Sequence, residues 1–165
     1  MTAVADSSPL VILAKLGCFD LLARLFPHVY ICPEVHHELV IAGAGLPGAS
    51  EVSRAEWIEV KAVENPAGLH SARRNQGLGP GEMSTILLAK EIGADVVLLD
   101  DYRARRWAKA EGLAILGSIG LLEAFYRQRY LTDLRHVFRQ LLGHNVYIDP
   151  RLLDRRLRSL GLPPL

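Results

Sequence analysis

The sequence contains only two cysteines, and it has neither a long apolar run nor a large charge of one sign. Cys18 and Cys32 are too few for a disulfide framework, and their spacing does not match a zinc knuckle. We therefore expect two core thiols in a reducing cytoplasm. The apolar stretch at residues 10–14 is far shorter than the roughly 18 residues that a membrane span needs, and no basic segment precedes it. Neither a membrane span nor a secretory signal is expected.

The net charge is +1, so the overall charge does not indicate a nucleic-acid-binding protein. The distribution of the charge is more informative, because basic residues form two local clusters. On charge alone, solvated helix faces are the better explanation, although such clusters are also compatible with phosphate contacts. The first cluster consists of Arg103, Arg105, Arg106 and Lys109, and the second consists of Arg151, Arg155, Arg156 and Arg158.

The chain has 165 residues, of which 50% are hydrophobic and 22% charged, so it fits one domain with or without a short tail. Short β-like runs alternate with helical segments along it. This alternation predicts an α/β fold with a parallel sheet.

The expected strands are residues 1–6, 29–32, 57–63, 95–99 and 113–116. Ser8 is expected to cap the first helix, with Pro9 at its first position and Gly17 ending it. Further helices are expected at residues 20–26, 34–42, 81–92, 101–111, 118–128, 132–142 and 150–160. We expect loops at residues 43–50 and 65–79, and a short extended segment at residues 146–148.

Several acidic residues are placed where strands end. Asp6 ends the first expected strand, and Asp100 and Asp101 follow the buried strand that precedes them. In open parallel sheets, ligand sites form beyond the carboxyl ends of the strands. Acids at two strand ends can therefore meet at one edge of the sheet.

Two glutamates on expected helices can reach the same edge. Glu82 shares a helix face with Ile86 and Ala89, and this face points to the sheet. Glu38 borders the apolar side of its own helix, next to Leu39, and can reach inward. Glu82 and Glu38 thus join the strand-end aspartates as candidate site residues.

Carboxylates raise one another's pKa when they gather, and burial does the same. A hard divalent cation such as Mg²⁺ removes this conflict, because it binds oxygen ligands and keeps several waters. One or two such ions can activate a water and stabilise the oxygens that attack and leave a phosphodiester. The set of acids therefore favours metal-dependent phosphodiester chemistry.

Each acid also has a structural interpretation. Asp6 can help to cap the first helix, and Glu82 is suited to the first turn of its own helix. Glu38 can be a surface acid, and Asp101 can cap the next helix and pair with Arg105. The functional interpretation depends on the set and not on one member.

Three segments together resemble the PIN-domain superfamily, and more narrowly its bacterial and archaeal branch related to VapC-type toxins. They are residues 4–17 (VADSSPLVILAKLG), residues 32–39 (CPEVHHEL) and residues 79–122, which begin GPGEMSTILLAK. The resemblance covers roughly residues 2–125 and is specific in the order of its motifs. It implies a Rossmann-like α/β/α sandwich around a central, mainly parallel sheet. It also implies a PIN-like nuclease domain at residues 1–130, with a C-terminal helical extension at residues 131–165 packed on the same domain.

The resemblance also implies an activity, namely a Mg²⁺- or Mn²⁺-dependent endoribonuclease that hydrolyses RNA phosphodiester bonds. Asp6 and Glu38 match the first two acids of the family, and Glu82 stands where VapC-type members usually carry Asp. Asp100 is slightly favoured over Asp101 as the fourth acid. The metal ligands are then Asp6, Glu82 and Asp100, the supporting residues are Glu38, Asp101, Ser7 and Ser8, and the RNA-binding residues are Arg103, Arg105 and Arg106.

The partners implied are RNA, a small antitoxin protein and a second copy of the chain. Ile119, Leu122 and Phe125 can form a dimer surface, but ordinary core packing explains them better. The alternative function is a catalytically silent PIN-fold module that binds RNA or protein.

Other enzyme classes fit poorly. A haloacid-dehalogenase phosphatase needs Asp-x-Asp after its first strand, where this chain has Asp6-Ser7-Ser8, and a receiver domain carries its acid pair after its first strand. A zinc hydrolase is disfavoured because no HExxH pattern occurs among the histidines. These include His28, His36, His37 and His70.

Overall fold

The computed structural model describes residues 1–67 and 77–165. Its centre is a five-stranded sheet in the order β3-β2-β1-β4-β5, in which every pair of neighbouring strands is parallel. The strands are β1 (Thr2–Ala5), β2 (His28–Ile31), β3 (Ile58–Val60), β4 (Val96–Leu98) and β5 (Ile115–Leu116). All five expected strands are thus confirmed; four are shorter than expected, and β2 has the expected length but begins one residue earlier.

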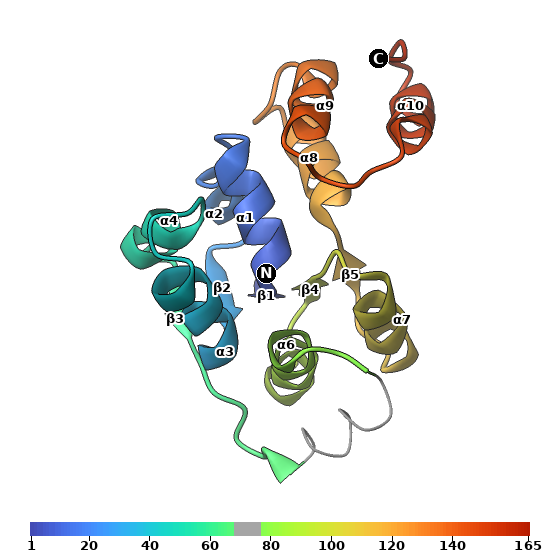
Figure 1. Ribbon diagram of the computed structural model, residues 1–165. Coiled ribbons are helices and arrows are strands. Elements are labelled where there is room, and N and C mark those ends of the chain that lie inside the picture. The colour runs from blue at the N-terminus through green and yellow to red at the C-terminus, as the bar shows by residue number, and fades with distance from the viewer. Residues whose placement is uncertain (68–76) are drawn as a thin grey trace. The chain divides into compact units, whose positions relative to one another are not determined.

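Helices α1 (Ser7–Lys15) and α6 (Pro80–Ile92) lie on opposite sides of the sheet in Figure 1. The other helical segments described before residue 118 are α2 (Leu21–Leu25), α3 (Pro33–His36), the π-helix η1 (His37–Ala42), α4 (Ala49–Arg54) and α7 (Tyr102–Ala110). Helices α8 (Ser118–Arg127), α9 (Leu134–Gly143) and α10 (Pro150–Ser159) follow in the C-terminal part of the chain. The expected α/β/α architecture is confirmed.

The order of the strands creates a crevice where the chain reverses direction across the sheet. From β1 the chain moves outward through β2 to β3, and it then returns to the other side of β1 for β4 and β5. Such a reversal point is where open α/β sheets bind ligands, beyond the carboxyl ends of the strands. Asp6 follows β1 and Asp100 follows β4, so both lie at this position.

Two local expectations were wrong. Helix α1 begins at Ser7, two residues before the expected first position at Pro9, so the cap position belongs to Asp6 and not to Ser8. The single helix expected at residues 34–42 instead changes from α-helical to π-helical hydrogen bonding at His37. π-Helical turns are rare in proteins, and those that occur are often found at functional sites.

One further segment differs from the expected pattern. Helix α4 was not expected at all, and it follows Gly48, which has a left-handed backbone with φ of 100°. Residues 146–148 belong to neither a helix nor a strand, so the short extended segment expected there stays a prediction. Most of the loop expected at residues 65–79, with Arg73, Arg74 and His70, lies outside the described residues.

The chain divides into two compact units, Met1–Gly120 and Leu121–Leu165. The core of the first unit contains Leu13, Ile31, Met83 and Leu98, none of which is exposed. Phe125 and Phe138 are the largest fully buried side chains of the second unit. The domain boundary at residue 130 and the packing of the C-terminal helices on the first unit stay predictions.

Three expectations about side chains and segments can be compared with the structure. Cys18 and Cys32 are both buried and free, as expected for core thiols. Leu122 and Phe125 are fully buried, which favours core packing over a dimer surface. No helix in the described part of the chain is both long and apolar enough to span a membrane.

Candidate functional site

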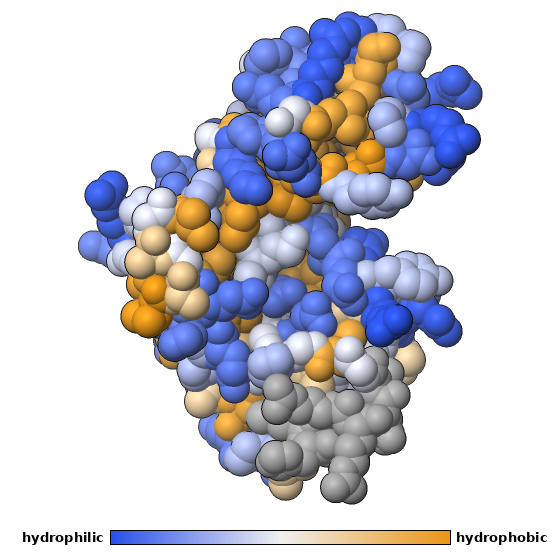
Figure 2. Space-filling model, viewed as in Figure 1, coloured by the Kyte–Doolittle hydropathy of each residue, from blue (hydrophilic) through white to orange (hydrophobic). Residues whose placement is uncertain are grey.

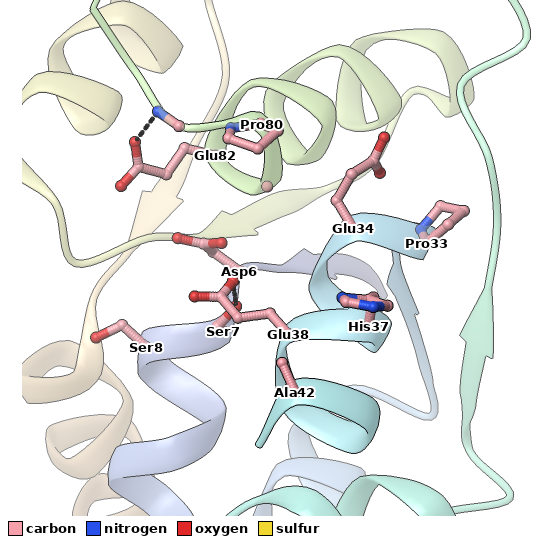
Figure 3. A pocket seen from close by; sticks show the side chains of 12 residues that line it. Asp6, Ser7, Ser8, Pro33, Glu34, His37, Glu38, Ala42, Pro80 and Glu82 are labelled. Atoms are coloured by element: carbon pink, nitrogen blue, oxygen red, sulfur yellow. Dashed lines mark hydrogen bonds between the residues drawn. The ribbon is translucent and has the colours of Figure 1, made fainter. Parts of the chain in front are cut away.

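An open cavity of about 680 Å³ lies beyond the carboxyl end of β1 in the first unit. Its described lining combines four carboxylic acids with no lysine or arginine. The residues are Asp6, Ser7, Ser8, Pro33, Glu34, His37, Glu38, Ala42, Gly79, Pro80, Gly81 and Glu82. Figure 3 shows Glu82 from α6 and Glu38 from η1 reaching toward Asp6. We call this cavity the acidic pocket.

Asp6 is the most deeply placed acid of the pocket, with 6% of its surface exposed. The end of β1 fixes its position, since its backbone N–H donates a 3.0 Å hydrogen bond to the Leu98 carbonyl of β4. The pKa of Asp6 is raised from 3.8 to about 7. Burial is the largest cause, the Ser7 backbone N–H opposes the shift, and the negative charges of the neighbouring acids Glu82, Glu38 and Asp100 add to it. Four acids distant in the sequence therefore share one electrostatic environment.

Glu38 is held against the start of α1 by a hydroxyl group. Ser7 Oγ donates a 2.6 Å hydrogen bond to Glu38 Oε2. Glu38 lies in the first turn of η1 and its side chain is otherwise exposed. A methyl group on Gly81, the glycine between them, would lie 3.6 Å from Glu38 Oε2 and 3.7 Å from Asp6 Oδ1. Glu38 and Asp6 thus face the same residue of α6.

Glu82 lies on the opposite wall, in the first turn of α6. Its Oε2 accepts a 3.1 Å hydrogen bond from the backbone N–H of Gly79, which precedes the helix. Glu82 is half-buried, and its pKa is raised first by desolvation and then by the charges of Asp101 and Glu38, against the lowering effect of the Gly79 N–H. The cap interaction explains the position of Glu82 in the helix, and the repulsion shows that its charge faces other acids.

Asp100 is held beside the pocket by two serines. Its Oδ1 accepts from the Ser118 backbone N–H at 2.7 Å, and its Oδ2 accepts from Ser118 Oγ at 2.6 Å and from Ser8 Oγ at 3.2 Å. Ser118 is the first residue of α8, after β5, and was not identified from the sequence. Asp100 does not line the acidic pocket itself, but its charge acts on Asp6.

Asp101 has a structural role. Its Oδ1 accepts a 2.9 Å hydrogen bond from the Ala104 backbone N–H and so caps α7. No ion pair joins it to Arg105 among the described contacts. Instead, Arg105 donates to the Leu99 carbonyl at 3.3 Å. The expected cap of the next helix by Asp101 is therefore confirmed, whereas the expected pairing of Asp101 with Arg105 is not observed among the described contacts.

The other two arginines of the first cluster are exposed on α7. Arg106 lies over the ring of Tyr102, 5.8 Å from its centre, and Arg103 comes close to Gly77. Neither lines the acidic pocket.

Residues 2–162 of the sequence match the family described as a PIN domain. The chain belongs to the PIN-domain family. No curated protein matches it. The PIN domain is a nuclease-type fold, its members are typically nucleases, and they generally use divalent metals.

The acidic pocket of this PIN domain suits a hard cation by the chemistry of its donors. Its carboxylate oxygens are the ligands that Mg²⁺ and Mn²⁺ prefer. No lysine or arginine of the described lining neutralises them, and hydrogen bonds restrain one carboxylate oxygen each on Glu38 and Glu82. Within residues 1–67 and 77–165, no three acidic, histidine or cysteine side chains already enclose one position for an ion. Water can complete the coordination, since Mg²⁺ retains several of its waters.

Glu34 is the member of the pocket that the sequence did not single out. It lies one helical turn before Glu38, and its carboxylate points away from Asp6 in Figure 3. Its Oε2 is buried and has no hydrogen-bond partner within the described chain. A first-turn glutamate after Pro33 looks like an ordinary macrodipole residue, so no sequence signal distinguished it.

Proposed function

We propose that this PIN domain is a Mg²⁺- or Mn²⁺-dependent endoribonuclease that hydrolyses RNA phosphodiester bonds. The observation that carries the proposal is the convergence of Asp6, Glu38 and Glu82 on one pocket, with Asp100 beside it. These acids come from β1, η1, α6 and the end of β4. A purely structural role does not explain why four separate elements bring like charges together, which costs free energy unless a cation binds.

The proposed metal ligands are Asp6, Glu82 and Asp100, directly or through water. When bound, the ion supplies a water activated for attack and stabilises the charge that develops on the phosphate. Glu38 orients the groups around Asp6, and Ser7 holds Glu38 in place. Ser8 and Ser118 fix the rotamer of Asp100. Asp101 supports the site through the cap of α7.

The exposed arginines of α7 are the proposed contacts to the RNA backbone near the site. Arg103 and Arg106 are free to meet phosphate groups, whereas Arg105 is directed at the Leu99 carbonyl and positions the backbone. Phosphate contacts of this kind position the substrate without reading its sequence.

We also propose that the enzyme acts in the cytoplasm as the toxin of a toxin–antitoxin pair and as a homodimer. The resemblance to VapC-type proteins supports this assignment. An apolar strip beside the pocket supports a protein partner: Ile41 and Leu46 are 59% and 64% exposed, and their neighbour Ala42 lines the pocket. An antitoxin segment seated there would cover the acids.

The test is cleavage of total RNA by the purified full-length chain in EDTA, in Mg²⁺ and in Mn²⁺, followed by mapping of the ends. The proposal predicts cleavage with metal only, and none by Asp6→Asn. The matched control is Asp20→Asn, which removes an exposed acid of the same unit. RNA binding without cleavage under every metal condition would favour the silent binding module instead.

A further inference from the structure

The charge of the chain is divided unevenly between its two units. Residues 121–165 carry eight arginines, no lysine and four acidic residues, whereas residues 1–120 carry 11 of the basic and 14 of the acidic residues. The near-neutral total therefore conceals a basic C-terminal unit. Arginine is also the side chain whose planar fork suits phosphate groups.

The acids of the C-terminal unit are already engaged. Glu123 forms an ion pair with Arg156, and Asp149 pairs with Arg151. Asp133 and Asp154 accept from backbone N–H groups, those of His136 and Leu165 respectively. Among the described contacts, no acid of the unit forms an ion pair with Arg155 or Arg158, although the charge of Asp149 acts on Arg155.

Three arginines lie on one face of α10, because Arg155 and Arg158 follow Arg151 at intervals of four and seven residues. Arg151 forms an ion pair with Asp149, so Arg155 and Arg158 are the two that form no ion pair among the described contacts. Leu153 and Leu157, on the other face, are fully buried. Arg155 and Arg158 are exposed and form no hydrogen bond or ion pair with the described chain. Figure 2 shows hydrophilic side chains along the outer sides of α9 and α10, with a hydrophobic strip between them.

An unburied aromatic residue precedes the same helix. Tyr147 has a relative exposure of 105%, so its whole ring is in solvent, and Asp149 caps α10 two residues later. An exposed aromatic ring beside free arginines is the combination that binds single-stranded nucleic acid, because bases stack on the ring while phosphates meet the cations. The buried leucines leave α10 no apolar face for a membrane, so the observations favour a nucleic acid over a lipid surface.

We infer that the C-terminal unit is a second RNA-binding surface, in which Arg155 and Arg158 hold the phosphate backbone and Tyr147 stacks on a base. This inference rests on the proposed ribonuclease function for the identity of the nucleic acid. It assigns the C-terminal helices a task separate from the acidic pocket, namely retention of single-stranded substrate.

The test measures binding of a fluorescein-labelled single-stranded oligouridylate by the full chain, in EDTA and over a series of salt concentrations. Arg155→Gln with Arg158→Gln should weaken binding several-fold. It should also lower the slope of log Kd against log salt by about 1.4, since each phosphate contact on a single strand contributes about 0.7. Tyr147→Ala should weaken binding about fivefold or more, and Tyr147→Phe should restore it.

The matched control is Arg54→Gln with Lys61→Gln, which removes the same charge from the first unit. Equal loss of affinity in this control, or unchanged affinity and slope in the α10 variant, would overturn the inference. Binding of vesicles that contain phosphatidylserine in preference to the RNA would overturn it as well. All the changed positions are exposed except Lys61, which is half-buried, and circular dichroism checks that every variant folds.

The two proposals fail separately. If the α10 variant loses RNA binding but the wild type shows no metal-dependent cleavage, the ribonuclease proposal is wrong and the RNA-binding surface is supported. If the wild type cleaves RNA with metal but the α10 variant binds RNA as the wild type does, the ribonuclease proposal is supported and the RNA-binding surface is wrong.

Discussion

Ser7 Oγ donates a hydrogen bond of 2.6 Å to Glu38 Oε2, and this contact joins the first residue of α1 to the first turn of η1. The two residues are 31 positions apart in the sequence. Ser7 follows Asp6 directly, so the contact holds Glu38 at the side of the most buried acid of the pocket. Ser7, the residue next to Asp6, therefore holds the second acid, Glu38, in place.

Replacing Ser7 by Ala should weaken Mn²⁺ binding by about 10- to 100-fold, because outer-shell partners of metal sites contribute about that much. Stability should change by only about 1 kcal/mol, since Glu38 is exposed and can bond to water instead. Titration calorimetry with Mn²⁺ checks the affinity. Ser50→Ala is the control, because Ser50 also donates to a glutamate, Glu51, at 3.3 Å. Equal affinity in the two variants would contradict the role of Ser7.

The raised pKa of Asp6 predicts an unusual pH dependence of stability in EDTA. The unfolded carboxyl has a pKa of 3.8 and the folded one a pKa of about 7, so between these values the folded state binds more protons. The stabilisation is present below the unfolded pKa and is lost as the pH rises through about 7. The loss in the free energy of unfolding is at most roughly 4 kcal/mol.

Urea denaturation of wild type and Asp6→Asn at several pH values isolates this effect. The two proteins should have similar stability near pH 4, and Asp6→Asn should be the more stable above about pH 7. Parallel pH curves for the two proteins would mean that the Asp6 carboxyl is not perturbed by its surroundings. Asp20→Asn serves as the control, since its curve should follow the wild type.

Substitutions of Glu82 can separate its role in capping α6 from its proposed role as a metal ligand. Glu82→Gln keeps an oxygen that can accept from the Gly79 N–H, so stability should hardly change. The charge is lost, so RNA cleavage should fall by more than the roughly 100-fold cost of losing an outer-shell partner. Glu82→Ala should in addition lose about 0.5–2 kcal/mol of stability. Full cleavage by Glu82→Gln would remove Glu82 from the metal ligands.

Asp100 and Asp101 are adjacent but should respond differently to the same change. Asp101→Asn retains a side-chain oxygen for the Ala104 N–H, so both stability and cleavage should stay near wild type. Asp100→Asn removes a charge that acts on Asp6, so cleavage should be lost. Metal-dependent RNA cleavage assays on the two variants decide between them. Loss of cleavage in Asp101→Asn at unchanged stability would assign the fourth acid to Asp101.

Much of the fold could be predicted because its signals are local. The run at Val96–Leu98 and the opening residues Thr2–Ala5 are short, apolar and bounded, and an acid follows each of them within two residues. Gly17 and Gly93 adopt left-handed backbone conformations with φ of 68° and 61°, which explains why they end helices. The strand-end acids then follow from the rule that parallel strands end at one edge.

What the sequence did not predict depends on tertiary contacts. The π-helical register of η1 depends on hydrogen bonds five residues apart, which no apolar pattern encodes. Helix α4 buries only Ala49 and Val52, so its six residues carry too weak a period to be recognised. Ser118 contacts Asp100 across 18 residues because β5 lies beside β4, and pairing of this kind is not visible in a local sequence pattern.

The most direct test of the account is a calorimetric titration of Mn²⁺ into the full-length chain at about pH 8, where Asp6 is ionised. We predict saturable binding by the wild type and by Asp20→Asn, and no detectable binding by Asp6→Asn. If Asp6→Asn binds Mn²⁺ as tightly as the wild type, or if the wild type does not bind it at all, the acidic pocket is not a metal site and the proposed nuclease mechanism is wrong.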